Sequence, residues 1–176
     1  GYDGVGQYAV HQAYGGPEAF VRFIDACHAR GLGVILDVVY NHLGPEGNYL
    51  AEFGPYFTDK HQTPWGAALN LDQEHADEVR AFFLGAAHQW LARFQCDGLR
   101  LDAVHALADD SEHHFLAEIA DASLAWEQEL GRPLFITAES DLNQPSMVSP
   151  TNSVAFARGM DAQWADDVHL SLIHIS

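Results

Sequence analysis

Short apolar segments alternate with longer amphipathic ones along this chain. Three apolar segments are suited to strands that are buried on both faces, at residues 33–40, 98–104 and 133–139. Apolar residues recur at helical intervals over residues 17–30, 75–94 and 112–130. Strands and helices that alternate in this way indicate parallel strands joined by crossover helices, so the pattern predicts an α/β fold.

A long connection, residues 41–73, separates the first expected strand from the second expected helix. It contains several glycine and proline turn signals and is rich in aromatic residues. Loops longer than about 15 residues inside a domain are commonly functional. The aromatic residues fit two interpretations equally well: they contact a ligand, or they fold the loop on itself.

Charge and composition narrow the possible partners. The 176-residue chain has a formal net charge of −17. Polyphosphates and anionic membrane surfaces would be repelled, so we expect neither nucleic acid nor a membrane as a partner. A neutral ligand such as a sugar meets no such penalty. The two cysteines are too few for a disulfide framework, which favours a reduced, cytoplasmic protein; the oligomeric state stays open.

Each expected strand carries an acidic residue near its C-terminal end, namely Asp37, Asp102 and Glu139. In a parallel barrel these ends converge on the catalytic face. Arg100 lies two positions before Asp102, so both side chains point to the same face, and their pairing would keep Asp102 ionised. Glu139 follows apolar residues, and this drier setting suits an acid that holds its proton. The alternative is that Arg100 and Asp102 form only a structural ion pair.

Further polar residues are expected at the same mouth. Asn41 and His42 close the first strand and offer an amide and an imidazole to sugar hydroxyls. His105 follows Asp102 by three residues and would project towards a ligand, although a surface histidine is an equal alternative. The adjacent His113 and His114 cannot chelate from one helix face, so we assign them no metal.

Three ordered motifs resemble the signatures of the α-amylase superfamily of glycoside hydrolases: residues 37–42, 98–105 and 138–139. The resemblance implies that residues 1–169 are part of a catalytic TIM (β/α)8 barrel, about its second to sixth strand units. It also implies a retaining mechanism with Asp102 as nucleophile and Glu139 as general acid and base, their carboxylates about 5 to 5.5 Å apart. No cofactor and no metal is expected, and Asp37 is expected to be structural.

The resemblance also assigns substrate-binding roles. Arg100 would position Asp102, His42 would bind the sugar at the cleavage subsite, and Tyr2 would be an aromatic platform there. Asn41 and His105 complete the expected substrate-binding residues. The implied substrate is of the maltooligosaccharide type.

Several motifs resemble one subfamily in particular, at residues 2–5, 54–59, 63–66, 101–105 and 138–141. Its members hydrolyse the α-1,4-glucosidic bond next to the trehalose end of maltooligosyltrehalose and release trehalose. Glucan branching enzymes, which transfer the cut chain to another glucan, are the alternative, together with other amylase-type hydrolases.

The chain begins with Gly1 rather than Met, and we expect it to be a piece of a longer protein. The superfamily's fourth signature, which carries a third catalytic Asp, is not found in it, so we expect the isolated chain to be inactive and poorly folded. Residues 170–176 read as a non-native tail. No run approaches the roughly 20 apolar residues of a membrane span, and no leader pattern opens the chain.

Two other protein classes fit parts of the pattern. Magnesium-dependent barrels of the enolase type also place acids at strand ends, but Arg100 would compete with a divalent cation for Asp102. A binding module without activity would be free to lose either carboxylate, and retention of both Asp102 and Glu139 favours an enzyme.

Overall fold

The computed structural model describes residues 2–165. Their main sheet is parallel and has four strands in the order β1 (Ile35–Val38), β4 (Gly98–Leu101), β5 (Phe135–Glu139) and β6 (Ala162–Trp164). The first three match the apolar segments of the sequence, and the crossovers between them are helical. The predicted α/β class with parallel strands is therefore confirmed.

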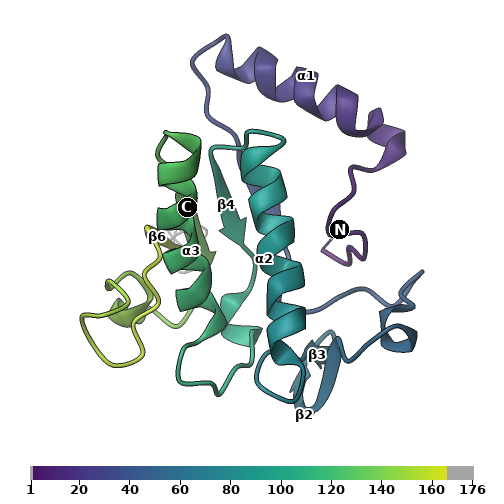
Figure 1. Cartoon of the computed structure of the whole chain (residues 1–176), viewed down its shortest axis with the longest axis vertical. Helices are drawn as coiled ribbons and strands as arrows, with labels where there is room; N and C mark the ends of the chain where they lie inside the picture. Colours follow the sequence, from purple (N-terminus) through teal and green to yellow (C-terminus); the bar gives the residue numbers. More distant parts are fainter. Residues whose placement is uncertain (1, 166–176) are drawn as a thin grey trace, which may run out of the picture.

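Three α-helices accompany the sheet: α1 (Gly16–His28), α2 (Ala76–Ala92) and α3 (Phe115–Leu130). Figure 1 shows α2 and α3 side by side against the sheet, with α1 apart from them. Gly15 precedes α1 with a φ of 92°, and Gly131 ends α3 with a φ of 65°, conformations in which glycine is favoured at helix ends. Short 3-10 helices lie at Gln12–Tyr14, Leu50–Glu52, Val104–Ala106 and Pro145–Met147.

The two faces of the main sheet differ. Side chains on the helix-covered face are 2% exposed or less, and they include Leu99, Leu101, Ile136 and Ala138. Asp37, Arg100 and Thr137 share one rung on the opposite face, where Ile35 and Phe135 are 47% and 40% exposed. The expectation that these strands are buried on both faces is thus wrong at Ile35, Asp37 and Phe135, because helices cover only the other face, whereas Thr137 in the middle of the sheet is 4% exposed.

The long connection contains an antiparallel hairpin that the sequence did not predict, formed by β2 (Phe57–Thr63) and β3 (Gly66–Leu69). Thr63 tightens its turn: its hydroxyl donates to the Gly66 carbonyl at 2.9 Å and accepts from the Trp65 amide at 3.2 Å. Gly66 has a φ of 146°, a conformation that side-chain-bearing residues rarely adopt.

Some of the predicted features lie outside the described residues. The domain boundary at residue 169 and the non-native tail at 170–176 lie beyond the described residues. Which barrel units the strands represent also stays a prediction. Among residues 2–165, none of the helices has the length and apolar character needed to cross a bilayer.

Candidate active site

Arg100 links three carboxylates at the C-terminal end of the sheet. Its Nη1 donates to Asp37 Oδ1 at 2.7 Å and to Asp102 Oδ1 at 3.0 Å, and its Nη2 lies 3.1 Å from Glu139 Oε2. The register pairs Leu101 with Ala138. Asp102 and Glu139 are thus neighbours on adjacent parallel strands, which are spaced about 4.8 Å apart. The structure brings together the three acids and the arginine that the sequence singled out.

The electrostatics of this group centre on the guanidinium. The side chains of Arg100, Asp102 and Glu139 are 15%, 14% and 14% exposed. Burial lowers the pKa of Arg100, but its hydrogen bond to Asp37 and the charges of the carboxylates outweigh burial, and the net effect raises the pKa. Arg100 therefore stays a cation at all working pH values and offsets the repulsion among the acids.

A strained turn fixes Glu139. Ala103, the residue after Asp102, has a φ of 43°, a left-handed conformation that is uncommon for alanine. Its backbone N–H donates to Glu139 Oε2 at 2.7 Å. The same carboxylate oxygen therefore faces two donors, the Ala103 amide and Arg100, and Glu139 is held in one orientation.

Asn41 and His42 are both buried and form a chain of contacts to Asp102. The Asn41 amide donates to the Asp102 carbonyl at 2.8 Å and lies 3.5 Å from its Oδ2. His42 Nδ1 lies 2.5 Å from Asn41 Oδ1, and His42 Nε2 lies 3.3 Å from Asp3 Oδ1. This contact of Asn41 with Asp102 was not predicted, and the expected sugar-binding roles stay predictions.

Tyr2 and His105 lie at the rim. The Tyr2 hydroxyl donates to Asp37 Oδ2 at 3.1 Å, and the negative charge of Asp37 raises the pKa of Tyr2. The Tyr2 side chain is 56% exposed, as an aromatic platform for a ligand requires. His105 Nδ1 lies 3.8 Å from Asp141 Oδ1, which places it near the loop that follows Glu139.

Two tryptophans adjoin this group. For Trp65, an aromatic residue of the long connection, the sequence left open a ligand contact or packing of the loop on itself, and it gave Trp164 no role. Trp65, from the hairpin turn, stacks on His42 with ring centroids 5.2 Å apart and planes inclined by 29°. The Arg100 guanidinium lies 5.9 Å from the ring centre of Trp164 in β6. Both are about half exposed. A periodic pattern cannot find them, because each owes its place to a turn or a short strand.

One group within residues 2–165 has the spacing of metal ligands: His61, Asp72 and Asp110, whose ligand atoms lie within 4.8 Å of one another. The sequence did not single these residues out. Lys60 Nζ lies 2.6 Å from Asp72 Oδ2 and 2.9 Å from Asp110 Oδ2, so the protein's own cation sits against both carboxylates.

A parallel α/β sheet with paired acids and an arginine at its strand ends is the arrangement expected of a glycosidase-type barrel site. The alpha amylase catalytic domain family matches residues 1–65. A crystal structure of a Salmonella typhimurium protein described as a candidate alpha amylase is 41% identical, with a TM-score of 0.83, and is matched over 98% of this chain and 29% of that one. The chain is therefore similar, over nearly its whole length, to proteins of the α-amylase superfamily.

Two named relatives show which kinds of superfamily enzyme the chain is similar to. The chain is 56% identical over 169 residues to the malto-oligosyltrehalose trehalohydrolase of Arthrobacter ramosus. The aligned region covers 96% of this chain and 29% of the relative. It is 41% identical over 115 residues to the 1,4-alpha-glucan branching enzyme of Nitrosomonas europaea, which covers 61% of this chain and 15% of that protein. The chain spans under a third of the length of these relatives.

Proposed function

We propose that this chain supplies the catalytic pair of a retaining glycosidase that releases trehalose from maltooligosyltrehalose. The observation that carries the proposal is the shared contact of Arg100 with Asp102 and Glu139. A retaining glycosidase needs two carboxylates close together, and a single guanidinium within 3.1 Å of both holds Asp102 and Glu139 beside each other. The similarity to the trehalohydrolases supports the substrate class.

In the proposed first step, Asp102 is the nucleophile. Its Oδ1 accepts a hydrogen bond from Arg100 at 3.0 Å, whereas its Oδ2 lies 3.5 Å from the Asn41 side-chain nitrogen. The less strongly hydrogen-bonded Oδ2 attacks the anomeric carbon, and the bond from that carbon to the glycosidic oxygen breaks. The electron pair of that bond goes to the departing oxygen.

Glu139 protonates that oxygen as the general acid. Glu139 Oε2 faces two donors, the Ala103 amide and Arg100, which fix the carboxyl group in place for this transfer. In the second step the Glu139 carboxylate takes a proton from water. The water oxygen then bonds to the anomeric carbon, the Asp102 ester breaks, and the configuration is retained.

The aromatic residues complete the proposed subsite. Tyr2 and Trp65 present exposed rings beside Asp37 and His42. Sugar rings pack their apolar faces on aromatic side chains, while hydroxyl groups bond to polar residues such as His42 and His105. We also propose a cytoplasmic location, in keeping with the free thiols of Cys27 and Cys96.

A glucan branching transferase is the second candidate, favoured by the similarity to the Nitrosomonas europaea enzyme. The first step would be the same. A glucan hydroxyl, rather than water, would then attack the glycosyl ester on Asp102. The two functions therefore differ in the acceptor and share the catalytic pair.

Product analysis separates the two. The stretch of this chain that aligns with the Arthrobacter ramosus relative would replace the matching 169 residues of that protein, and the chimera would be incubated with maltooligosyltrehalose and, separately, with amylose. Free trehalose supports the proposal, and new branch points on amylose would replace it with the transferase. Asp102→Asn and Glu139→Gln should each abolish turnover, whereas Glu129→Gln, in an exposed pair with His88, is the matched control.

A further inference from the structure

A buried carboxylate outside the catalytic pair, Asp72, joins three segments of the fold. Its side chain is 2% exposed. Asp72 Oδ2 lies 2.6 Å from Lys60 Nζ and 2.9 Å from His61 Nε2, both in β2. The same oxygen accepts the backbone N–H of Asp110 at 2.9 Å, from the loop between β4 and α3.

The carboxylate of Asp110 contacts the same two side chains of β2 as Asp72 does. Asp110 Oδ2 lies 2.9 Å from Lys60 Nζ and 3.7 Å from His61 Nε2. Lys60 therefore bridges two acids from different segments. Because its ammonium already lies against both carboxylates, the arrangement is that of a partly exposed ion-pair cluster around the buried Asp72 carboxylate rather than that of an open cation site.

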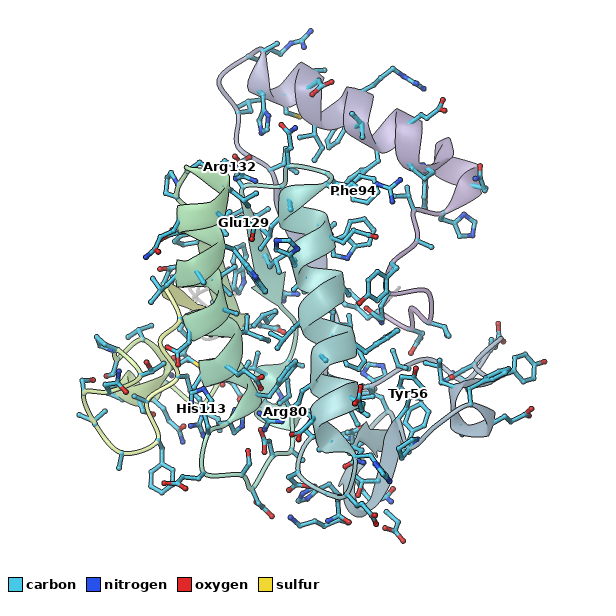
Figure 2. The ribbon with its side chains drawn as sticks, in the orientation of Figure 1. Tyr56, Arg80, Phe94, His113, Glu129 and Arg132 are labelled. Carbon is cyan, nitrogen blue, oxygen red and sulfur yellow. The ribbon has the colours of Figure 1, made fainter. Side chains whose placement is uncertain are left out.

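A second tie lies next to the first along the chain. Arg80 in α2 donates to the carbonyls of Leu71 and His113, at 2.7 and 3.1 Å, and pairs with Asp109. Arg80 and His113 lie close together at the end of the α2 and α3 pair in Figure 2. Arg80 thus joins Leu71 to Asp109, and the next residue on each segment makes a direct contact, Asp72 with the Asp110 backbone. Both Asp109 and Asp110 lie in the loop that follows the proposed nucleophile.

The turn of the β2–β3 hairpin reaches the site. Trp65 in the hairpin turn stacks on His42. His42 contacts Asn41, whose amide donates to the Asp102 carbonyl. Asp72 therefore holds β2 through Lys60 and His61, and the hairpin contacts the site through Trp65.

We propose that Asp72 is a positioning residue that fixes the β2–β3 hairpin, so that Trp65 stays stacked on His42 at the substrate mouth. Asp72 contacts no reacting atom and acts through the hairpin. Its effect on docking of the hairpin follows from the contacts alone. Its effect on substrate affinity rests on the proposed glycosidase function, and the two are measured separately.

Hydrogen exchange in the chimera tests the docking. Asp72→Asn should make the slowly exchanging amides of residues 57–69 exchange on the order of 100-fold faster, because the contacts of Lys60 and His61 with the Asp72 carboxylate are weakened and the hairpin opens locally. The amides of α3 should keep their rates. Glu129→Gln should change neither segment. Unchanged protection of the hairpin in Asp72→Asn would overturn the proposal.

Steady-state kinetics with maltooligosyltrehalose tests the consequence for the site. Asp72→Asn should raise KM about tenfold with a smaller change in kcat, because the hairpin contributes to binding of the ground state and of the transition state alike. General loss of folded enzyme would lower apparent kcat and leave KM as it was, and that result would overturn the positioning role. Asp72→Glu, which keeps the carboxylate, should show a KM between those of the parent and of Asp72→Asn.

Two safeguards keep the outcomes distinct. If Asp72→Asn does not fold, Lys60→Met removes the bridging ammonium from a side chain that is 35% exposed, and it must raise exchange in residues 57–69 for the proposal to stand. If the parent chimera shows no turnover of any glucan, the proposed function fails, while the exchange measurement still decides the role of Asp72.

Discussion

Asp72 is expected to stabilise the fold at neutral pH and to lose this contribution in acid. Burial raises the pKa of Asp72, but hydrogen bonds from Lys60, His61 and the Asp110 backbone outweigh burial and lower the pKa from 3.8 to about 2. Each pKa unit corresponds to about 1.4 kcal/mol, so the contribution to the free energy of unfolding is about 2 kcal/mol.

The sign of the pH dependence follows from the direction of the shift. A carboxyl group whose pKa is lower in the folded state stabilises the fold above its unfolded pKa, here 3.8, and stops doing so as the pH falls through about 2. Asp72→Asn removes the titrating group. The free energy difference between the parent chimera and the variant should therefore shrink by about 2 kcal/mol between pH 6 and pH 2.

Urea unfolding of both proteins at intervals of pH measures this difference. The comparison cancels the titration of acids distant from Asp72, because they are common to both proteins and do not interact with the changed side chain. Glu129→Gln, which changes an exposed acid, should differ little from the parent at every pH. A difference between parent and Asp72→Asn that does not change between pH 6 and pH 2 would refute the reasoning.

Two further changes test the sheet and the charge balance of the site. Gly98→Ala should destabilise the fold by about 3 kcal/mol, because a Cβ on Gly98 would lie 2.0 Å from the Phe135 carbonyl oxygen on the neighbouring strand. Thermal unfolding beside Gly4→Ala, where a Cβ meets nothing within 4 Å, checks this, and equal midpoints would contradict it. Arg100→Met should lower kcat about 100-fold or more, since three carboxylates would lose their shared cation; steady-state rates measure this, and an unchanged kcat would contradict it.

The sequence predicted the main elements because their apolar residues follow the period of each element. The expected helices at 17–30, 75–94 and 112–130 correspond to α1, α2 and α3, with ends that differ by a few residues. The second strand was expected to reach residue 104 but ends at Leu101. The left-handed conformation of Ala103 turns the chain there, and no apolar pattern encodes such a turn.

The hairpin and β6 escaped prediction for a different reason. β2 is polar, and its Lys60 and His61 are held by Asp72, beyond the end of the hairpin, and by Asp110, which lies far along the chain from them. Contacts of this kind leave no local periodicity. β6 has only three residues and depends on pairing with β5. Tertiary contacts decided both elements.

The candidate site was predictable in its acids but not in its support. Asp37, Asp102 and Glu139 stand at strand ends, and parallel pairing alone brings such positions together. The Ala103 amide on Glu139 and the Asn41 amide on the Asp102 carbonyl depend on turn geometry. They could be seen only once the backbone was known.

The central claim is that Asp102 forms the covalent bond to the sugar. The most direct test is to trap that intermediate by incubating the chimera with 5-fluoro-α-glucosyl fluoride, whose ring fluorine slows breakdown of a glycosyl ester, and then to locate the label by peptide mass spectrometry. The account predicts one fluoroglucosyl group on Asp102 and none in Asp102→Asn. A label on Asp37 or Glu139 instead, or turnover that persists in Asp102→Asn, would contradict it.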